Sequence, residues 1–94
     1  MTRITLTPIM DRSAVKAHLD ELKAAFAEAG SIEIACEAVE QIGLAGLQLL
    51  ASAVRTGQER GTGVVLAGVG DTLAATVRLA GMKQILLPAD GATS

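Results

Sequence analysis

The chain has 94 residues, half of which are hydrophobic, and it contains one aromatic residue, Phe26. Eight basic and ten acidic residues give a net charge of −2, and because they form no basic stripe, no nucleic-acid partner is expected. This composition excludes a disordered chain. It predicts one packed domain over residues 1–94, with its core at about 3–87 and a frayed tail at 90–94.

The cysteine content and the hydrophobic runs indicate a cellular location. Cys36 is the single cysteine, so it cannot form an internal disulfide, and a reducing compartment is favoured. The N-terminus lacks a hydrophobic signal segment, and no apolar run has the length needed to cross a membrane. We therefore expect a cytoplasmic protein without direct membrane insertion.

The first part of the chain predicts a strand followed by a helix. Residues 3–7 alternate between apolar and polar side chains, as a half-buried strand does, and Pro8 limits its continuation. Apolar residues then recur at helical spacing, namely Val15, Leu19, Leu22 and Phe26. We expect Asp11 or Ser13 to cap this helix and Gly30 to end it.

The middle of the chain predicts a second strand and a second helix. Residues 31–36 alternate again, and a short irregular link, residues 37–42, leads to a glycine-containing corner. The helix that follows has an apolar stripe made of Leu47, Leu50, Ala51 and Val54, and Gly61 is expected to end it. Three residues fall roughly opposite this stripe and either touch a flanking helix or extend an exposed apolar patch. They are Ala45, Leu49 and Ala53.

The last part of the chain adds a strand, a helix and a short final strand. Residues 64–67 form a continuous apolar run, which is typical of a central strand. A glycine turn and the cap candidate Asp71 open a helix that ends at Gly81, with its buried side expected at Leu73, Val77 and Ala80. A last strand is expected at residues 85–87. The order β-α-β-α-β-α-β predicts an α/β domain with a mostly parallel sheet and helices packed on it.

The sequence contains little that could carry out catalysis. His18 is the only histidine; we expect it to be partly exposed on the side of its helix, and no residue spacing resembles a zinc site. Cys36 has no base expected beside it and is interpreted as a small residue that fills a strand end. Gly68 and Gly70 are followed by Leu73 where a dinucleotide fingerprint has its third glycine, and Asp71 would repel a phosphate. We therefore predict no enzyme activity, no metal and no cofactor.

The corner before the second helix resembles a binding site without reactive groups. Its residues, Gly43 to Gly46, include no hydroxyl, carboxylate, thiol or imidazole. Glu33, Glu37 and Glu40 precede it, and acidic residues near a helix start are ordinarily solvated there. An apolar corner with an acidic rim favours protein docking over acid–base chemistry.

The chain from residue 4 to about 87 resembles a STAS domain, the fold of anti-sigma-factor antagonists. Seven residues stand where the pattern of that family expects them, namely Val39, Ile42, Gly46, Leu47, Leu79, Gly81 and Met82. The aspartate of the family motif falls on Gly43, the phosphoacceptor serine on Leu44, and the next serine or threonine on Ala45. Since leucine cannot accept phosphate, the resemblance implies a STAS domain without the phosphorylation switch.

Within this family, the segments LTPIMDRSAVKAHLDEL and VEQIGLAGLQLLASAV are most similar to the CheS-type STAS proteins of alphaproteobacterial chemotaxis operons. That resemblance implies a non-catalytic adaptor that binds a CheA-type histidine kinase and modulates response-regulator dephosphorylation. The partner-binding residues it implies are Glu40, Ile42, Gly43, Leu44, Ala45, Gly46, Val69, Gly70 and Asp71. Alternatives are a STAS subunit of a phospholipid-transport ATPase and an unphosphorylatable antagonist-like regulator. A ligand-binding domain and a self-associating homo-oligomer also stay open.

Overall fold

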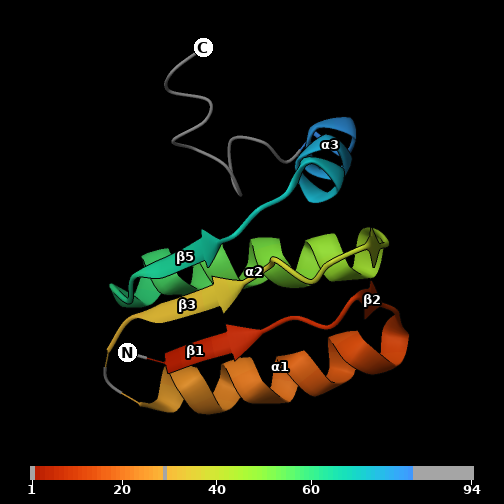
Figure 1. Cartoon of the computed structure of the whole chain (residues 1–94). Coiled ribbons are helices and arrows are strands. Elements are labelled where there is room, and N and C mark those ends of the chain that lie inside the picture. Colours follow the sequence, from red (N-terminus) through yellow and green to blue (C-terminus); the bar gives the residue numbers. More distant parts are fainter. Residues whose placement is uncertain (1, 29, 82–94) are drawn as a thin grey trace.

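The fold consists of two small parallel sheets and three helices, seen in a computed structural model that describes residues 2–28 and 30–81 (Figure 1). The strands of the larger sheet, in the order β1-β3-β5, are Thr2–Thr5, Ile32–Ala35 and Val64–Ala67. The smaller sheet pairs β2, Ile9–Met10, with β4, Gln41–Ile42. The helices α1, α2 and α3 span Arg12–Ala27, Leu44–Arg60 and Asp71–Leu79.

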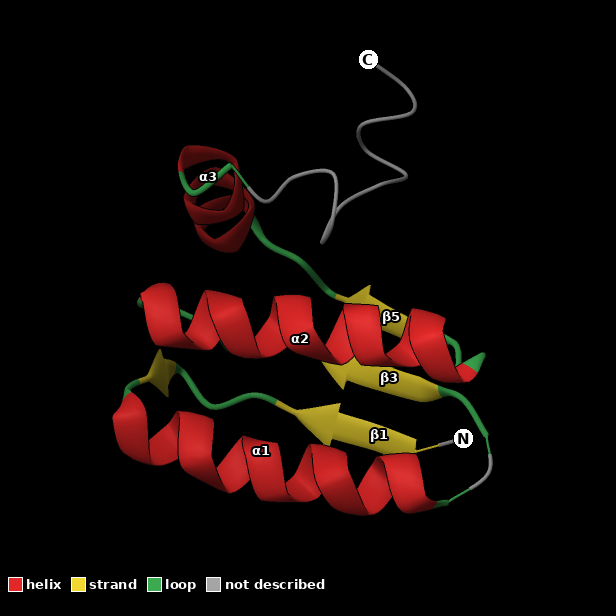
Figure 2. Ribbon diagram, turned by 180° about the vertical axis from the view of Figure 1, so that it is seen from behind, coloured by secondary structure: helices red, strands yellow, loops and turns green. Residues whose placement is uncertain are grey.

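Two of the described helices form one layer on the larger sheet, and the third packs elsewhere. α1 and α2 run side by side on one face of the three-stranded sheet (Figure 2), whereas α3 lies against β4. The predicted α/β class with a mostly parallel sheet is therefore confirmed. The predicted strand at 85–87, the predicted tail at 90–94 and Met82 lie outside the described residues.

The β1–β3 and β2–β4 pairs are formed by the same two stretches of chain, but with different offsets. Thr2 pairs with Ile32, thirty residues later, whereas Ile9 pairs with Gln41, thirty-two residues later. The two additional residues form a turn at positions 37 and 38, which is closed by a hydrogen bond from the Val39 N–H to the Cys36 carbonyl at 3.1 Å. This turn ends β3 and directs the chain toward β4 and the start of α2.

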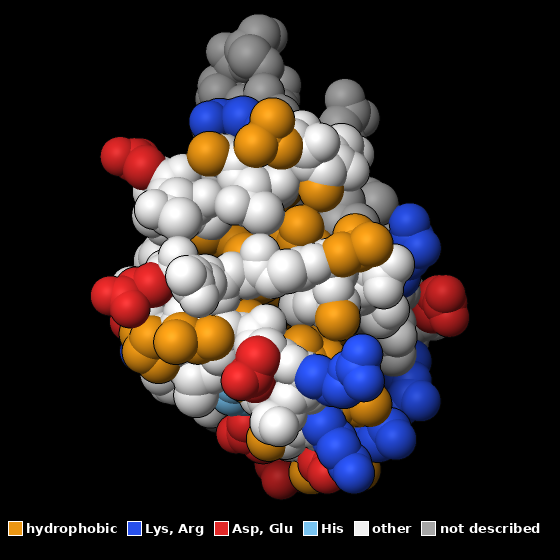
Figure 3. Space-filling view, turned by 90° about the vertical axis from the view of Figure 1, so that its right-hand side faces the viewer, with side chains coloured by type: hydrophobic (Ala, Val, Ile, Leu, Met, Phe, Trp, Pro, Cys, Tyr) orange, Lys and Arg blue, Asp and Glu red, His pale blue; other side chains and the backbone are white. Residues whose placement is uncertain are grey.

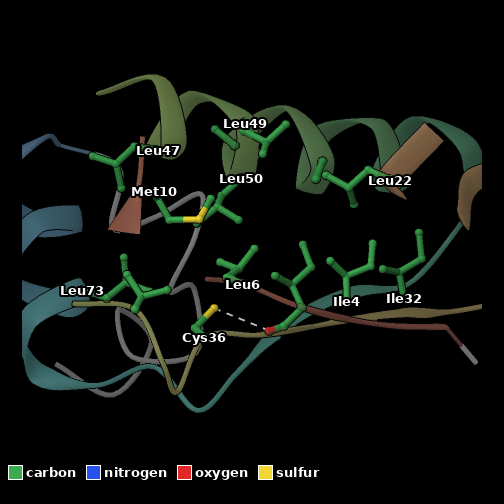
Figure 4. Close-up of a cluster of buried hydrophobic side chains, with 14 of the residues drawn as sticks. Ile4, Leu6, Met10, Leu22, Ile32, Cys36, Leu47, Leu49, Leu50 and Leu73 are labelled. Carbon is green, nitrogen blue, oxygen red and sulfur yellow. Dashed lines mark hydrogen bonds between the residues drawn. The ribbon is translucent and has the colours of Figure 1, made fainter. Parts of the chain in front are cut away.

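The core lies between the three-stranded sheet and the helices (Figure 4). Inward-facing residues of the strands, such as Ile4 and Ile34, meet Leu22 of α1 and Leu50 of α2, which is completely buried. Leu73 of α3 joins the same cluster. Since this core contains only aliphatic side chains, Met10 and Cys36 besides the half-buried Phe26, its cohesion depends on close packing of small residues.

α1 differs from its predicted burial by one position. Leu22 is buried and Phe26 half-buried, but Leu19 is 39% exposed, while His18 is 4% exposed. The expectation of a partly exposed histidine was therefore wrong. The face that meets the sheet is that of His18, Leu22 and Ala25, because α1 packs on both β1 and α2 and this turns Leu19 toward the outer side of the helix pair.

The helix ends follow the sequence prediction in part. Asp11 caps α1, with its Oδ1 accepting a hydrogen bond from the Ala14 N–H at 2.9 Å. α1 ends at Ala27, earlier than expected, and Gly30 has φ of +135° beyond the helix. Gly61 ends α2 in the left-handed conformation with φ of +70°, as predicted.

α3 also departs from the prediction. Asp71 is its first helical residue, and Gly70 occupies the cap position instead. Leu73 and Val77 are buried as expected, but Ala80 is exposed because the helix ends at Leu79, one residue before it.

β5 was predicted to be central; in the described sheet β3 lies between β1 and β5, and the strand predicted at residues 85–87 lies outside the described residues. The described part of the chain gives β5 one neighbour, β3, and Val65 is 56% exposed. An apolar run cannot distinguish burial of one face from burial of both, since valine is frequent in either setting.

Gly57 allows the end of α2 to lie close to β5. A Cβ atom at this position would be 2.6 Å from Cγ2 of Val64 and 2.7 Å from the Thr62 carbonyl oxygen. The Thr62 N–H also donates to the Gly57 carbonyl at 2.8 Å. The helix, the turn after it and the first residue of β5 are thus held together at a glycine.

Candidate docking site

The first part of the candidate site is the start of α2. Gly43 is the cap residue in an extended conformation, and it offers no side chain to the free N–H groups of the first turn. Its carbonyl accepts from the Leu47 N–H at 3.1 Å. Leu44, the first helical residue, has 61% of its surface exposed, so the leucine at the family's acceptor position is not a core residue.

Gly46 holds this corner against the neighbouring segment. It is buried, and a Cβ atom added to it would lie 2.6 Å from Cγ1 of Ile42 and 3.4 Å from Cβ of Met10. The first turn of α2 therefore packs directly on β2 and β4, and this fixes the position of Leu44.

The second part of the candidate site is the turn between β5 and α3. Gly68 has φ of +69°, and a Cβ atom there would collide with the Glu37 side chain. The positive φ favours glycine at this position, and any side chain here would also have to displace that of Glu37. The turn continues through the half-buried Val69 to Gly70 and Asp71, which are exposed.

The structure brings both parts to one end of the molecule. β3 and β5 are parallel, so the segments that follow them leave from the same edge of the sheet, and α3 lies against β4 (Figure 1). Among the nine predicted residues, only Gly46 is buried. Ile42 and Val69 are half-buried, and the exposed ones are Glu40, Gly43, Leu44, Ala45, Gly70 and Asp71.

Ile9 belongs to the same end of the molecule and was not predicted. It is 53% exposed and pairs with Gln41 in the β2–β4 sheet. The preceding carbonyl, that of Pro8, accepts from the N–H groups of Glu40 and Gln41 at 2.8 and 3.0 Å. The sequence marks Ile9 only as an apolar residue that follows Pro8, where the first strand was expected to end. A two-residue strand has no periodicity that would reveal its partner.

Charge is distributed unevenly around this end. Figure 3 shows hydrophobic and acidic side chains spread across it, with most of the basic side chains gathered at the lower right. Two of the rim glutamates are already paired, because Arg3 lies 3.5 Å from Glu33 and 3.3 Å from Glu37. Glu40 makes no salt bridge with the described residues, so it is the rim carboxylate that remains available to a partner.

The reactive side chains near this end are arranged for packing. Cys36 is buried and donates to the Ile34 carbonyl at 3.5 Å, and its burial, together with the nearby Glu37 charge, raises the pKa of the thiol to about 11. The only histidine bonds to Glu21 through Nδ1, at 2.6 Å, rather than to a nucleophile. Residues 2–28 and 30–81 contain no group of three or more metal-ligating side chains.

The apolar residues opposite the α2 stripe do not extend the docking surface. Leu49 and Ala53 are buried, and α1 and α2 are in contact along this side, whereas Ala45 is exposed. The flanking-helix alternative is therefore the one found for Leu49 and Ala53. Ala45 lies beside Leu44 at the corner, and the large exposed apolar residues there are Ile9 and Leu44.

None of the described helices is both long enough and apolar enough to cross a bilayer. The described chain is an α/β domain with a helix pair on one face of a parallel sheet and an uncharged, exposed helix start. A family model described as "Mlab, STAS domain" matches residues 1–88, and the chain belongs to this STAS domain family. STAS domains generally are non-catalytic regulatory domains that mediate protein–protein interactions. A search of curated proteins finds no match.

Proposed function

We propose that this STAS domain is a non-catalytic adaptor that binds a CheA-type histidine kinase of a chemotaxis system. Binding modulates dephosphorylation of the response regulator that receives phosphate from that kinase. The docking surface consists of the nine residues predicted from the sequence, with Ile9 added to them. This proposal rests on the resemblance to CheS-type proteins and on the geometry of the α2 corner.

The observation that carries the proposal is the exposure of Leu44. Leu44 keeps 61% of its surface exposed at the helix start, so most of its apolar surface contributes nothing to the stability of the fold. Exposed apolar residues at one end of a domain are typical of interaction sites. Because Leu44 replaces a phosphoacceptor serine, binding at this surface would not be switched by phosphorylation of the chain itself.

The available carboxylates indicate the chemistry of the partner surface. Glu40 and Asp71 are exposed on the two parts of the site, and they favour a partner with an apolar centre and basic residues around it. Charges at the rim of an interface mainly increase the association rate, whereas the apolar centre supplies the binding energy.

Affinity capture with a tagged chain from a lysate of the source organism tests the proposal. The wild type should retain a CheA-type histidine kinase, and Leu44→Glu should not. An exposed glutamate in the first helical turn is favourable for the helix, so the variant's free energy of unfolding should change by about 0.5 kcal/mol or less. Far-UV circular dichroism measures that change, because the chain has no tryptophan or tyrosine.

Val65→Glu is the matched control, since Val65 is exposed to a similar degree on β5. It should retain the kinase. Recovery of a lipid-transport ATPase would instead support the alternative of a STAS subunit, and recovery of a sigma-regulating kinase would support the antagonist-like regulator. If Leu44→Glu retains the same partner as the wild type, the α2 corner is not the docking surface.

A further inference from the structure

A groove lies between α1 and α2, away from the docking corner. It has a volume of about 350 Å³ and is lined on the α1 side by Leu19, Leu22, Lys23 and Phe26. The α2 side contributes Leu49 and Ala53 to the apolar floor, two hydroxyl side chains and Arg60. The groove lies between the two helices that cover one face of the sheet (Figure 2).

The groove is apolar at one end and cationic at the other. α1 and α2 run in the same direction (Figure 1), so Leu19 and Leu49, which come early in the lining segments, mark one end. Arg60 marks the other end, where its guanidinium carbon lies 5.5 Å above the centre of the Phe26 ring. Lys23 lies between them on α1, and no aspartate or glutamate lines the groove.

The size of the groove limits what it can hold. A volume of 350 Å³ lies near the lower end of the range for small-molecule sites, which is about 300–1,000 Å³. A protein partner would need an interface of about 1,000 Å² or more, and most apolar residues of this groove are already buried. One aliphatic chain suits the groove, and the two long chains of a phospholipid do not.

We propose that this groove binds a free aliphatic chain that ends in an anionic group. The chain lies on the floor formed by Leu22, Leu49 and Ala53, and the anion faces Lys23 and Arg60. The chain also covers the apolar surface that Leu19 and Phe26 leave exposed, which supplies the affinity, and the two cations select the negative head. The site is separate from the α2 corner and does not depend on the proposed function.

Decanoate, kept below its micelle concentration, is the probe. Calorimetric titration should give one saturable site per chain, and amide chemical shifts should change along α1 and α2. Decyltrimethylammonium, which has the same chain length and a positive head, should not bind. Binding of both probes with similar affinity would overturn the assigned role of the two cations.

Lys23→Glu should weaken decanoate binding about tenfold or more, the loss expected when one charge-assisted contact becomes a repulsion. Lys16→Glu is the matched control, because Lys16 is exposed on the same helix outside the groove, and its dissociation constant should stay within about twofold. Ser52→Phe introduces a ring at an exposed lining position and should abolish binding without disturbing the core.

Leu44→Glu should leave decanoate binding unchanged, so failure of this site can be distinguished from failure of the proposed function. The proposal is wrong if decanoate shows no saturable binding. It is also wrong if Lys16→Glu weakens binding as much as Lys23→Glu does. Tight association with phosphatidylglycerol vesicles that survives Ser52→Phe would indicate a membrane surface in place of the groove.

Discussion

His18 is the residue whose environment differs most from that of a typical histidine. Its side chain is buried on the sheet-facing side of α1, where Nδ1 lies 2.6 Å from Oε1 of Glu21. The other ring nitrogen, Nε2, is buried and has no hydrogen-bond partner among the described residues. A buried polar atom without a partner costs about 1–3 kcal/mol.

His18→Leu should therefore raise the free energy of unfolding by about 1 kcal/mol, because a similar volume is kept and the unpaired nitrogen is removed. Urea unfolding followed by circular dichroism measures the change. His18→Ala should instead lower stability, since it leaves a cavity. If His18→Leu destabilises the chain as much as His18→Ala, Nε2 has a partner that the structure does not show.

The burial pattern of α1 shows how far sequence periodicity can predict which residues of a helix are buried. The helical stripe correctly included Leu22 and Phe26, but it selected Leu19 in place of His18. The two lie next to each other on the helix, and hydropathy favours leucine. The choice between them depends on the position of α2, which lies far along the chain and cannot be read from the local pattern.

At the scale of elements, Gly57 links α2 to β5. Glycine inside a helix is ordinarily unfavourable by about 0.5–1 kcal/mol relative to alanine. Here, however, a Cβ atom would lie 2.7 Å from a backbone oxygen, that of Thr62, which cannot rotate away as a side chain can.

Gly57→Ala should therefore destabilise the chain by about 1–3 kcal/mol despite the better helix propensity of alanine. Gln58→Ala, at the exposed neighbouring position, should be neutral or slightly stabilising. Thermal unfolding of both variants gives the comparison. A stabilised Gly57→Ala would mean that the end of α2 can move away from β5.

Element prediction succeeded where elements were long. The three helices and the strands at residues 2–5, 32–35 and 64–67 agree with the expected positions. β2 and β4 were not predicted, because two residues are too few to show an alternating pattern. For the same reason, nothing in the sequence indicated that Ile9 lies beside the predicted corner residues.

For the whole molecule, the buried thiol of Cys36 couples stability to alkaline pH. Folding raises its pKa from an ordinary value of 9.0 to about 11. The folded chain therefore keeps the proton while the unfolded chain loses it, and the stabilisation from this group is complete below about pH 9. It is lost progressively as the pH rises from about 9 to about 11.

The free energy of unfolding should accordingly decline more steeply between pH 9 and pH 11 in the wild type than in Cys36→Ala. Urea midpoints at several pH values in this range measure the two slopes. Because Cys36 is buried, Cys36→Ala should be less stable at neutral pH, so the slopes and not the absolute values are compared. Equal slopes would show that the thiol does not ionise differently in the folded and unfolded chain.

The sequence separation between paired strands also affects how the chain folds. Every described strand pair joins residues that are thirty or thirty-two positions apart, and none is a hairpin. No sheet contact can therefore form before a long loop closes, and loop closure of that kind slows folding. The hydrogen bonds within each helix are local, so the helices can form transiently first. A polypeptide emerging from the ribosome has to wait for β3 before β1 gains a partner.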